Sequence, residues 1–210
     1  MAQQDYRLKD LNDVRAVFTS LGVRFFVVYG LALGIYRDGS PLPSDDDIDL
    51  AVVDPIDFKT RKAIGWKLYD LGFEPQAIAF NVFGRMEPIG LGYEGDHETG
   101  IIVCERNFKF TIFFFKEEEC DQHGPEYVCI PKVAAMKLIA SPKRFYEKSS
   151  TIKIGGKKYL APHPIEDYLA FSYFDNWKDK TDRRHSLTYQ EQHAQASITK
   201  DEANGVMIMK

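Results

Sequence analysis

The sequence has few features of a secreted, membrane-spanning or metal-knuckle protein. Its 210 residues include only three cysteines, an odd number that lacks the close pairing of a zinc knuckle or a redox motif. No apolar run approaches the length of a membrane span, and residues 1–5 are polar where a signal sequence would be basic and apolar. These absences predict a soluble cytoplasmic protein with reduced thiols and no membrane span.

An excess of basic residues is also missing. The chain has 27 Lys and Arg against 31 Asp and Glu, which gives a formal net charge of -4 at pH 7. Such a balance lacks the electrostatic footprint of nucleic-acid binding, so we expect no nucleic-acid polymer among the partners. The length suits one packed domain, predicted over residues 1–177 and followed by a polar C-terminal tail over residues 178–210.

The apolar run at residues 25–28 ends at Gly30 and predicts a buried strand that is followed at once by a helix. Glycine has no Cβ, so a bulky ligand can approach the backbone at this corner. The first N–H groups of a helix that begins near Leu31 have no partner within the helix and favour an anion. We expect the anion to be a phosphate.

Residues 47–53 alternate between acidic and apolar side chains, as in a strand with one acidic face. Asp47 and Asp49 would then lie roughly 6 to 7 Å apart, where two carboxylates repel each other unless a cation lies between them. Oxygen-only ligands of this kind suit Mg²⁺ or Mn²⁺. The alternative is an ordinary acidic turn at residues 44–47. Asp49 argues against it, because an unpaired charge inside the apolar alternation is costly.

The same residues resemble a known family. Residues 30–49 are similar, without a gap, to the pattern Gly-Thr-Leu-Leu-Gly-x-x-Arg followed by Ile-Pro-Trp-Asp-Asp-Asp-x-Asp of the LicD/fukutin-related family, which belongs to the nucleotidyltransferase-fold superfamily. Leu31 stands in place of the usual Thr, and Ser44 in place of the usual Trp. The matching positions are Gly30, Leu33, Gly34, Arg37, Pro43, Asp45, Asp46, Asp47 and Asp49. A weaker similarity continues at Pro162, Glu166, Tyr168, Leu169, Tyr173 and Trp177.

A third carboxylate is expected on a neighbouring strand, because the superfamily typically has Asp-Ile-Phe there. This chain has Thr111-Ile112-Phe113 instead. A third carboxylate usually helps to bind a metal and can deprotonate the attacking hydroxyl, whereas a threonine hydroxyl can only hydrogen-bond a water ligand. Glu105 is expected roughly 20 Å away along an extended strand, too far to stand in unless the strand bulges.

The pattern of the whole chain predicts an α/β (α+β) fold, with a nucleotidyltransferase-like mixed sheet flanked by helices. Apolar spacings of three and four predict helices. These cover residues 6–21, 55–71, 131–139 and 165–173. Runs of aliphatic and aromatic residues predict strands and a hairpin through Gly155-Gly156. The strands cover residues 73–82, 85–89, 101–104 and 108–115, with a loop over residues 90–100.

The resemblance implies a metal-dependent phosphoryl-type transferase. Asp47 and Asp49 would be catalytic and would hold Mg²⁺ or Mn²⁺. The expected substrate-binding residues are Gly30, Leu31, Gly34, Arg37 and Thr111. For Arg37, which follows the corner by about two helical turns, a salt bridge to Asp45 or Asp46 is an alternative to phosphate contact.

In the LicD version of this reaction, a phospho-alcohol such as phosphocholine moves from a CDP-linked donor to a hydroxyl acceptor such as a glycan. One alternative is a small-molecule nucleotidyltransferase of the aminoglycoside type, with a nucleoside triphosphate as donor. Another is a non-catalytic nucleotide-binding relative, since Thr111 replaces the expected aspartate.

Overall fold

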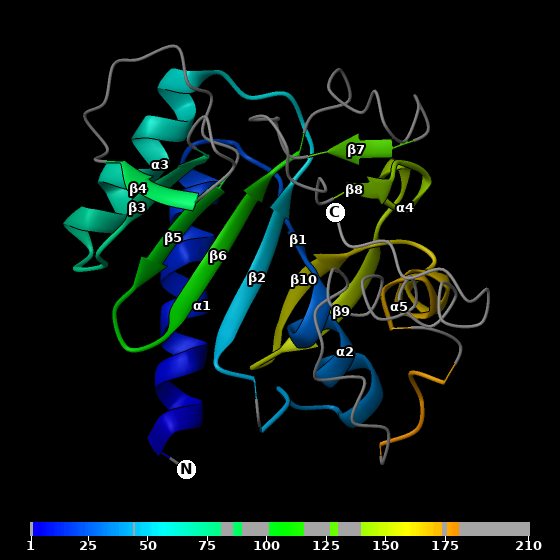
Figure 1. Cartoon of the computed structure of the whole chain (residues 1–210). Coiled ribbons are helices and arrows are strands. Elements are labelled where there is room, and N and C mark those ends of the chain that lie inside the picture. Colours follow the sequence, from blue (N-terminus) through cyan, green and yellow to red (C-terminus); the bar gives the residue numbers. More distant parts are fainter. Residues whose placement is uncertain are drawn as a thin grey trace, which may run out of the picture. The chain divides into compact units, whose positions relative to one another are not determined.

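The computed structural model describes residues 2–43, 45–80, 86–89, 101–115, 127–129, 140–173 and 176–180. The chain forms two compact units, Met1–Ile165 and Glu166–Lys210. The first unit contains the sheet and the predicted site (Figure 1). The predicted helix at residues 131–139 and the predicted loop at residues 90–100 lie outside the described residues.

The first unit is built on an eight-stranded mixed sheet in the order β4-β3-β5-β6-β2-β1-β10-β9. Its strands are β1 (Phe26–Val27), β2 (Asp47–Val52), β3 (Gln76–Phe80), β4 (Met86–Ile89), β5 (Ile101–Glu105), β6 (Lys109–Phe114), β9 (Ser150–Ile154) and β10 (Lys157–Ala161). β2 runs parallel to β6, and β1 runs parallel to β10. The other neighbouring strands are antiparallel. A separate two-stranded sheet pairs β7 (Tyr127–Cys129) with β8 (Ala140–Pro142).

Helices flank this sheet, which confirms the predicted mixed α/β class. The helices of this unit are α1 (Ala2–Ser20), α2 (Tyr29–Asp38), α3 (Phe58–Asp70) and α4 (Arg144–Glu147). Helix α5 (Ile165–Tyr173) belongs, apart from its first residue, to the second unit. Figure 1 shows α1 passing behind β5 and β6, and α1 also contacts α3. α2 contacts β2 and β9. None of the helices in the described part of the chain is both long and apolar enough to cross a membrane.

The local signals placed most of these elements correctly. Gly155 and Gly156 have φ values of +55° and +79° and form the tight turn between β9 and β10, as the hairpin prediction required. The predicted start of the third helix at Pro55 is wrong. The helix begins at Phe58, because the Asp57 side chain caps it by accepting a hydrogen bond from the Thr60 N–H at 2.7 Å.

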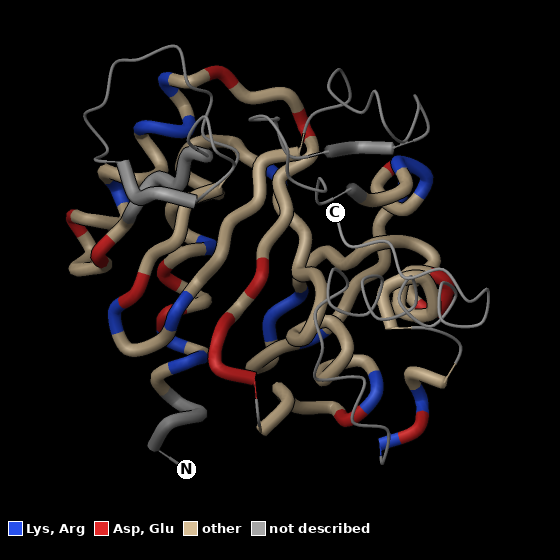
Figure 2. The backbone as a smooth tube through the Cα atoms, viewed as in Figure 1, with Lys and Arg blue, Asp and Glu red and all other residues tan. Residues whose placement is uncertain are grey.

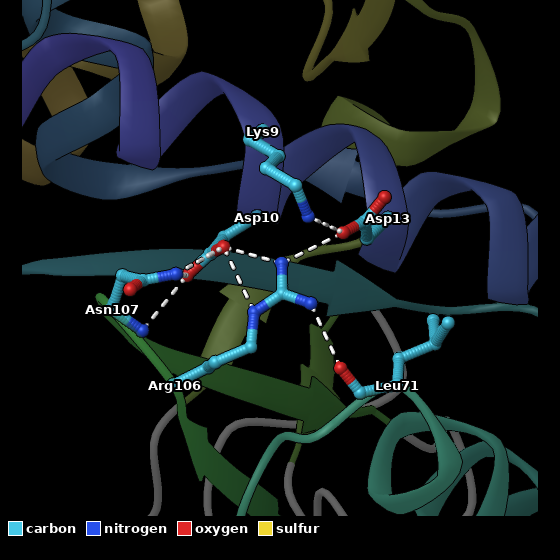
Figure 3. Close-up of polar contacts among 6 residues, drawn as sticks. All are labelled: Lys9, Asp10, Asp13, Leu71, Arg106 and Asn107. Atoms are coloured by element: carbon cyan, nitrogen blue, oxygen red, sulfur yellow. Dashed lines mark hydrogen bonds and ion pairs between the residues drawn. The ribbon is translucent and has the colours of Figure 1, made fainter.

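A polar cluster ties α1 to the turn between β5 and β6 (Figure 3). We call it the Arg106 clamp, after its central residue. Asp10 is fully buried and accepts hydrogen bonds from Arg106 Nε at 3.1 Å and from the Asn107 N–H at 3.1 Å. The Arg106 guanidinium also donates to Asp13 at 2.7 Å and to the Leu71 carbonyl at 2.8 Å. Every carboxylate of the clamp is therefore matched by donors.

Candidate functional site

Four polar side chains share one face of the sheet where β2 and β6 begin. In the parallel register, Asp47 lies opposite Lys109, and Asp49 lies opposite Thr111. These four residues are partly exposed, whereas the residues between them on both strands are buried. We call them the polar face. Figure 2 shows the acidic run at the start of β2 next to a basic position at the start of β6.

The carboxylates preceding β2 extend this face. One oxygen from each of Asp45, Asp46 and Asp47 lies within 4.8 Å of the others, a spacing that could hold a metal ion. Together with Asp49 they form what we call the acidic cluster. Its ligand atoms are all carboxylate oxygens, the donors that Mg²⁺ and Mn²⁺ prefer. The residues present therefore fit the predicted cation.

The pKa values of the carboxyls in the acidic cluster also favour cation binding. Burial raises the pKa of Asp45 to about 6, and the Asp47 and Asp46 charges add to this effect while Arg7 and Lys109 oppose it. Burial also raises the pKa of the Asp49 carboxyl well above its usual range, and Asp47 and Asp45 contribute. Burial and mutual repulsion thus disfavour the ionised form of Asp45 and Asp49 in the metal-free chain, and a bound divalent cation would favour it.

The Gly30 corner lies next to this cluster. The Val28 N–H donates to the Asp49 carbonyl at 3.2 Å, so the end of β1 runs beside Asp49. The chain then turns into α2 through Tyr29, whose φ of +48° is strained for a residue with a side chain. A Cβ on Gly30 would overlap the Asp45 carboxylate, with Cγ at 2.9 Å. The glycine therefore leaves room for a negatively charged group at the N-terminus of α2.

The other predicted substrate-binding residues lie on α2. Leu31 is buried, so only its backbone could face a ligand. A Cβ on Gly34 would lie 2.7 Å from the Leu42 backbone nitrogen, which gives this glycine a packing role against the loop that leads to the acidic cluster. Arg37 forms an ion pair with the adjacent Asp38 at 2.9 Å, a partner that the sequence pattern does not predict. Phosphate contact by Leu31, Gly34 and Arg37 stays a prediction.

Two basic residues near the site were missed from the sequence. Lys109 Nζ lies 3.3 Å from Asp47 Oδ2. Arg7, on α1, donates to the Asp45 carbonyl at 2.7 Å and to the Leu42 carbonyl at 3.4 Å, and its guanidinium lies over the Phe108 ring. Arg7 thereby holds the acidic loop in place. Neither contact has a local signal, because each joins segments that are far apart in the sequence.

The expectation that Glu105 lies roughly 20 Å from Thr111 is wrong. It assumed one extended strand, but the chain reverses between β5 and β6, and Glu105 lies opposite Lys109. One strand spacing and two residues along β6 separate the Glu105 and Thr111 backbones, roughly 8 Å in all. Glu105 is exposed. It is therefore a carboxylate close to the polar face, although not at the position that Thr111 occupies.

Comparison with protein families confirms the resemblance inferred from the motif. Residues 22–74 match the family described as LicD/FKTN/FKRP, nucleotidyltransferase domain. This segment includes β1, the Gly30 corner, β2 and α3. Asp47 and Asp49 thus lie within the matched region, whereas Lys109 and Thr111 lie outside it. No significant match was found among curated protein sequences.

Among solved structures, the chain is similar to the antibiotic-resistance factor ANT(2'')-Ia, with 12% identity, 95% of this chain and 89% of that chain covered, and a TM-score of 0.49. ANT(2'')-Ia in complex with adenylyl-2''-tobramycin gives 14% identity, 94% of each chain and a TM-score of 0.44. The lincomycin-bound lincosamide antibiotic adenylyltransferase LnuA gives 11% identity, 91% of this chain and 95% of that chain, and a TM-score of 0.47. Likenesses at this level carry no information about substrates.

Proposed function

We propose that this protein is a metal-dependent transferase that moves a phosphorus-centred group from a nucleotide donor to a hydroxyl acceptor. The observation that carries the proposal is the placement of Asp47 and Asp49 on one face, directly beside the Gly30 corner. The family match supports a nucleotidyl- or phosphotransferase kind of function. The resemblance to LicD favours a phospho-alcohol such as phosphocholine as the transferred group, a CDP-alcohol as the donor and a glycan as the acceptor.

The chain's own residues would divide the work. Asp47 and Asp49 would hold Mg²⁺ or Mn²⁺, which neutralises charge on the donor phosphates when bound. The Gly30 corner would offer the first backbone N–H groups of α2 to a phosphate oxygen, displacing the Asp45 carboxylate that lies there. Thr111, opposite Asp49, would hydrogen-bond a water or the acceptor hydroxyl.

The transfer itself is a substitution at phosphorus. The acceptor oxygen forms a new P–O bond in line with the P–O bond that breaks, and the leaving group departs with the electron pair of that bond. For a CDP-alcohol donor the leaving group is CMP, and for a nucleoside triphosphate it is pyrophosphate. The acceptor proton passes to water, because the Thr111 hydroxyl cannot take it at neutral pH.

The first test is calorimetric titration of the natural chain with CDP-choline, CTP, ATP and GTP, each with Mg²⁺ or Mn²⁺. We expect at least one nucleotide to bind only when metal is present, and Asp47→Ala and Asp49→Ala to weaken that binding about 100-fold. Asp54→Ala is the matched control, since Asp54 is an exposed aspartate that pairs with Arg24. Metal-independent binding, or no binding of any nucleotide, would contradict the proposal.

Nucleotide binding without turnover is the second candidate, and one observation favours it. Thr111 occupies the position opposite Asp49, so the neighbouring strand supplies a hydroxyl instead of a carboxylate there. In this case the natural chain would bind donor but release CMP or pyrophosphate barely faster than buffer, and Thr111→Asp would raise that release. Efficient turnover by the natural chain, with no gain from Thr111→Asp, would exclude this candidate.

A further inference from the structure

The polar face contains one strong positive charge where a symmetric two-metal site would need another carboxylate. Two-metal sites hold their ions about 4 Å apart and need carboxylates that reach both. Here β2 supplies Asp47 and Asp49, but the facing positions on β6 are Lys109 and Thr111. A threonine hydroxyl is neutral, and an ammonium group repels a cation. Strands β2 and β6 together therefore present two carboxylates, enough to hold one divalent cation, beside the positive charge of Lys109.

The Lys109 side chain is free enough to change partner. Its ammonium lies 3.3 Å from Asp47 Oδ2, and the Lys109 side chain is 41% exposed. A half-exposed ion pair of this kind contributes little stability, so exchanging it costs little. The Lys109 backbone lies one strand spacing from Asp47, roughly 5 Å, and a four-carbon stem can carry the ammonium across the face without moving the sheet.

A cation and the lysine would compete for the same carboxylate. If Asp47 held a divalent ion, the Lys109 ammonium would lose this partner and would be repelled by the ion. Donor phosphates bound beside the ion would offer the ammonium a new anionic partner, which a lysine binds as a point charge. The Lys109–Asp47 contact would then be the arrangement of the donor-free chain.

We propose that Lys109 takes the place of a second metal ion, by leaving Asp47 when a single divalent cation binds and by neutralising the donor phosphates. This inference rests on the proposed function, since it assumes that a metal and a nucleotide share the polar face. It adds a donor-binding residue outside the segment that matches the family. It also explains why a chain with Thr111 on β6 could still bind a highly charged donor.

The test measures Mn²⁺ binding to the full chain by electron paramagnetic resonance, first with Mn²⁺ alone and then with CDP-choline, CTP, ATP or GTP. The variants are Lys109→Met, Lys109→Arg and the control Lys158→Met, which replaces an exposed lysine on β10. We expect one Mn²⁺ per natural chain. Lys109→Met should bind Mn²⁺ alone about fivefold more tightly, because the competing ammonium is gone. It should bind the Mn²⁺–nucleotide about tenfold more weakly.

In Lys109→Met, the affinity for Mn²⁺ alone should rise while the affinity for the Mn²⁺–nucleotide falls. A purely structural role of Lys109 would instead weaken both affinities or leave both unchanged. Lys109→Arg keeps the charge and should retain most of the nucleotide affinity, while the Lys158 variant should match the natural chain. Two Mn²⁺ ions per natural chain with nucleotide bound, or parallel changes in Lys109→Met, would overturn the role of Lys109 alone. A natural chain that binds none of the four Mn²⁺–nucleotides would overturn the proposed function and this inference together.

Discussion

The Arg106 clamp and the acidic cluster are both built from aspartates, but hydrogen-bond donors match the carboxylates of the clamp, whereas the carboxylates of the acidic cluster lie mainly against one another. In the clamp, burial alone would raise the pKa of Asp13, yet hydrogen bonds from Arg106 and Lys9 lower it below its usual range. In the acidic cluster, burial and neighbouring carboxylates raise the pKa values of Asp45 and Asp49. Buried carboxylates that accept hydrogen bonds from matched donors stabilise a fold. Neighbouring carboxylates that lack such donors instead favour the binding of a cation from solution.

The clamp should be the more costly of the two to break. Replacing Asp10 by Ala leaves the largely buried Arg106 guanidinium without its main partner, so we expect the free energy of unfolding to fall by about 3 kcal/mol in urea titrations. The control is Asp54→Ala, which breaks an Arg–Asp pair with both side chains 42% exposed and should cost less than about 1 kcal/mol. Equal losses in the two variants would mean that burial does not distinguish these pairs.

In the acidic cluster, removing a carboxylate should increase the free energy of unfolding, whereas in the clamp it should decrease it. Asp49→Asn removes a carboxyl whose ionised form is disfavoured by desolvation and by the neighbouring carboxylates, so the free energy of unfolding of the metal-free chain should increase at pH 7. The same variant should lose metal-dependent nucleotide binding in calorimetry. A loss of stability in the metal-free variant would show that Asp49 has a structural partner and would remove the contrast with the clamp.

The pH dependence of stability gives the smallest effect and sharpens the comparison. A carboxyl whose pKa is higher in the folded chain holds its proton longer when folded, so the free energy of unfolding decreases as pH rises through that pKa. For Asp45 this window runs from about 4 to about 6. From the Asp45 shift alone, urea titrations of the metal-free chain should show a loss of about 2 kcal/mol in the free energy of unfolding between pH 4.5 and pH 7.

The double variant Asp45→Asn, Asp49→Asn is the control for this titration and should show a flatter profile. Asp13 acts in the other direction, because its lowered pKa makes the chain less stable only as pH falls below the usual range of an aspartate. The two clusters therefore affect different parts of the profile. If the stability of the natural chain followed the same profile as that of the double variant between pH 4.5 and pH 7, the raised pKa values would be contradicted.

Local patterns predicted the parts of the molecule that depend on local physics. Alternation in residues 47–53 correctly placed Asp47 and Asp49 on one face of β2, and the glycine pair at 155–156 correctly placed a hairpin. The ion pair of Lys109 with Asp47 could not be read in the same way, because it depends on the register between two strands whose segments are some sixty residues apart.

The contacts made by α1 were hidden for the same reason. Its apolar spacing predicted only a helix that covers a sheet, and no prediction was made for its polar residues. Arg7 instead holds the acidic loop, and Asp10 holds the turn before β6. Likewise, Glu105 was misplaced because the sequence does not show that the chain reverses at Arg106.

The spacing of Arg7 and Asp10 on α1 fixes the distance between two segments of the site. Arg7 and Asp10 are three residues apart, so the helix sets their anchors about 4.5 Å apart along its axis and on nearly the same side. One anchor fixes the loop that carries Asp45, and the other fixes the turn from which Lys109 starts. The distance between the acidic loop and the start of β6 is therefore set by less than one turn of α1. A single residue inserted between Arg7 and Asp10 would rotate one of them by 100° about the helix axis, so both contacts could no longer form together.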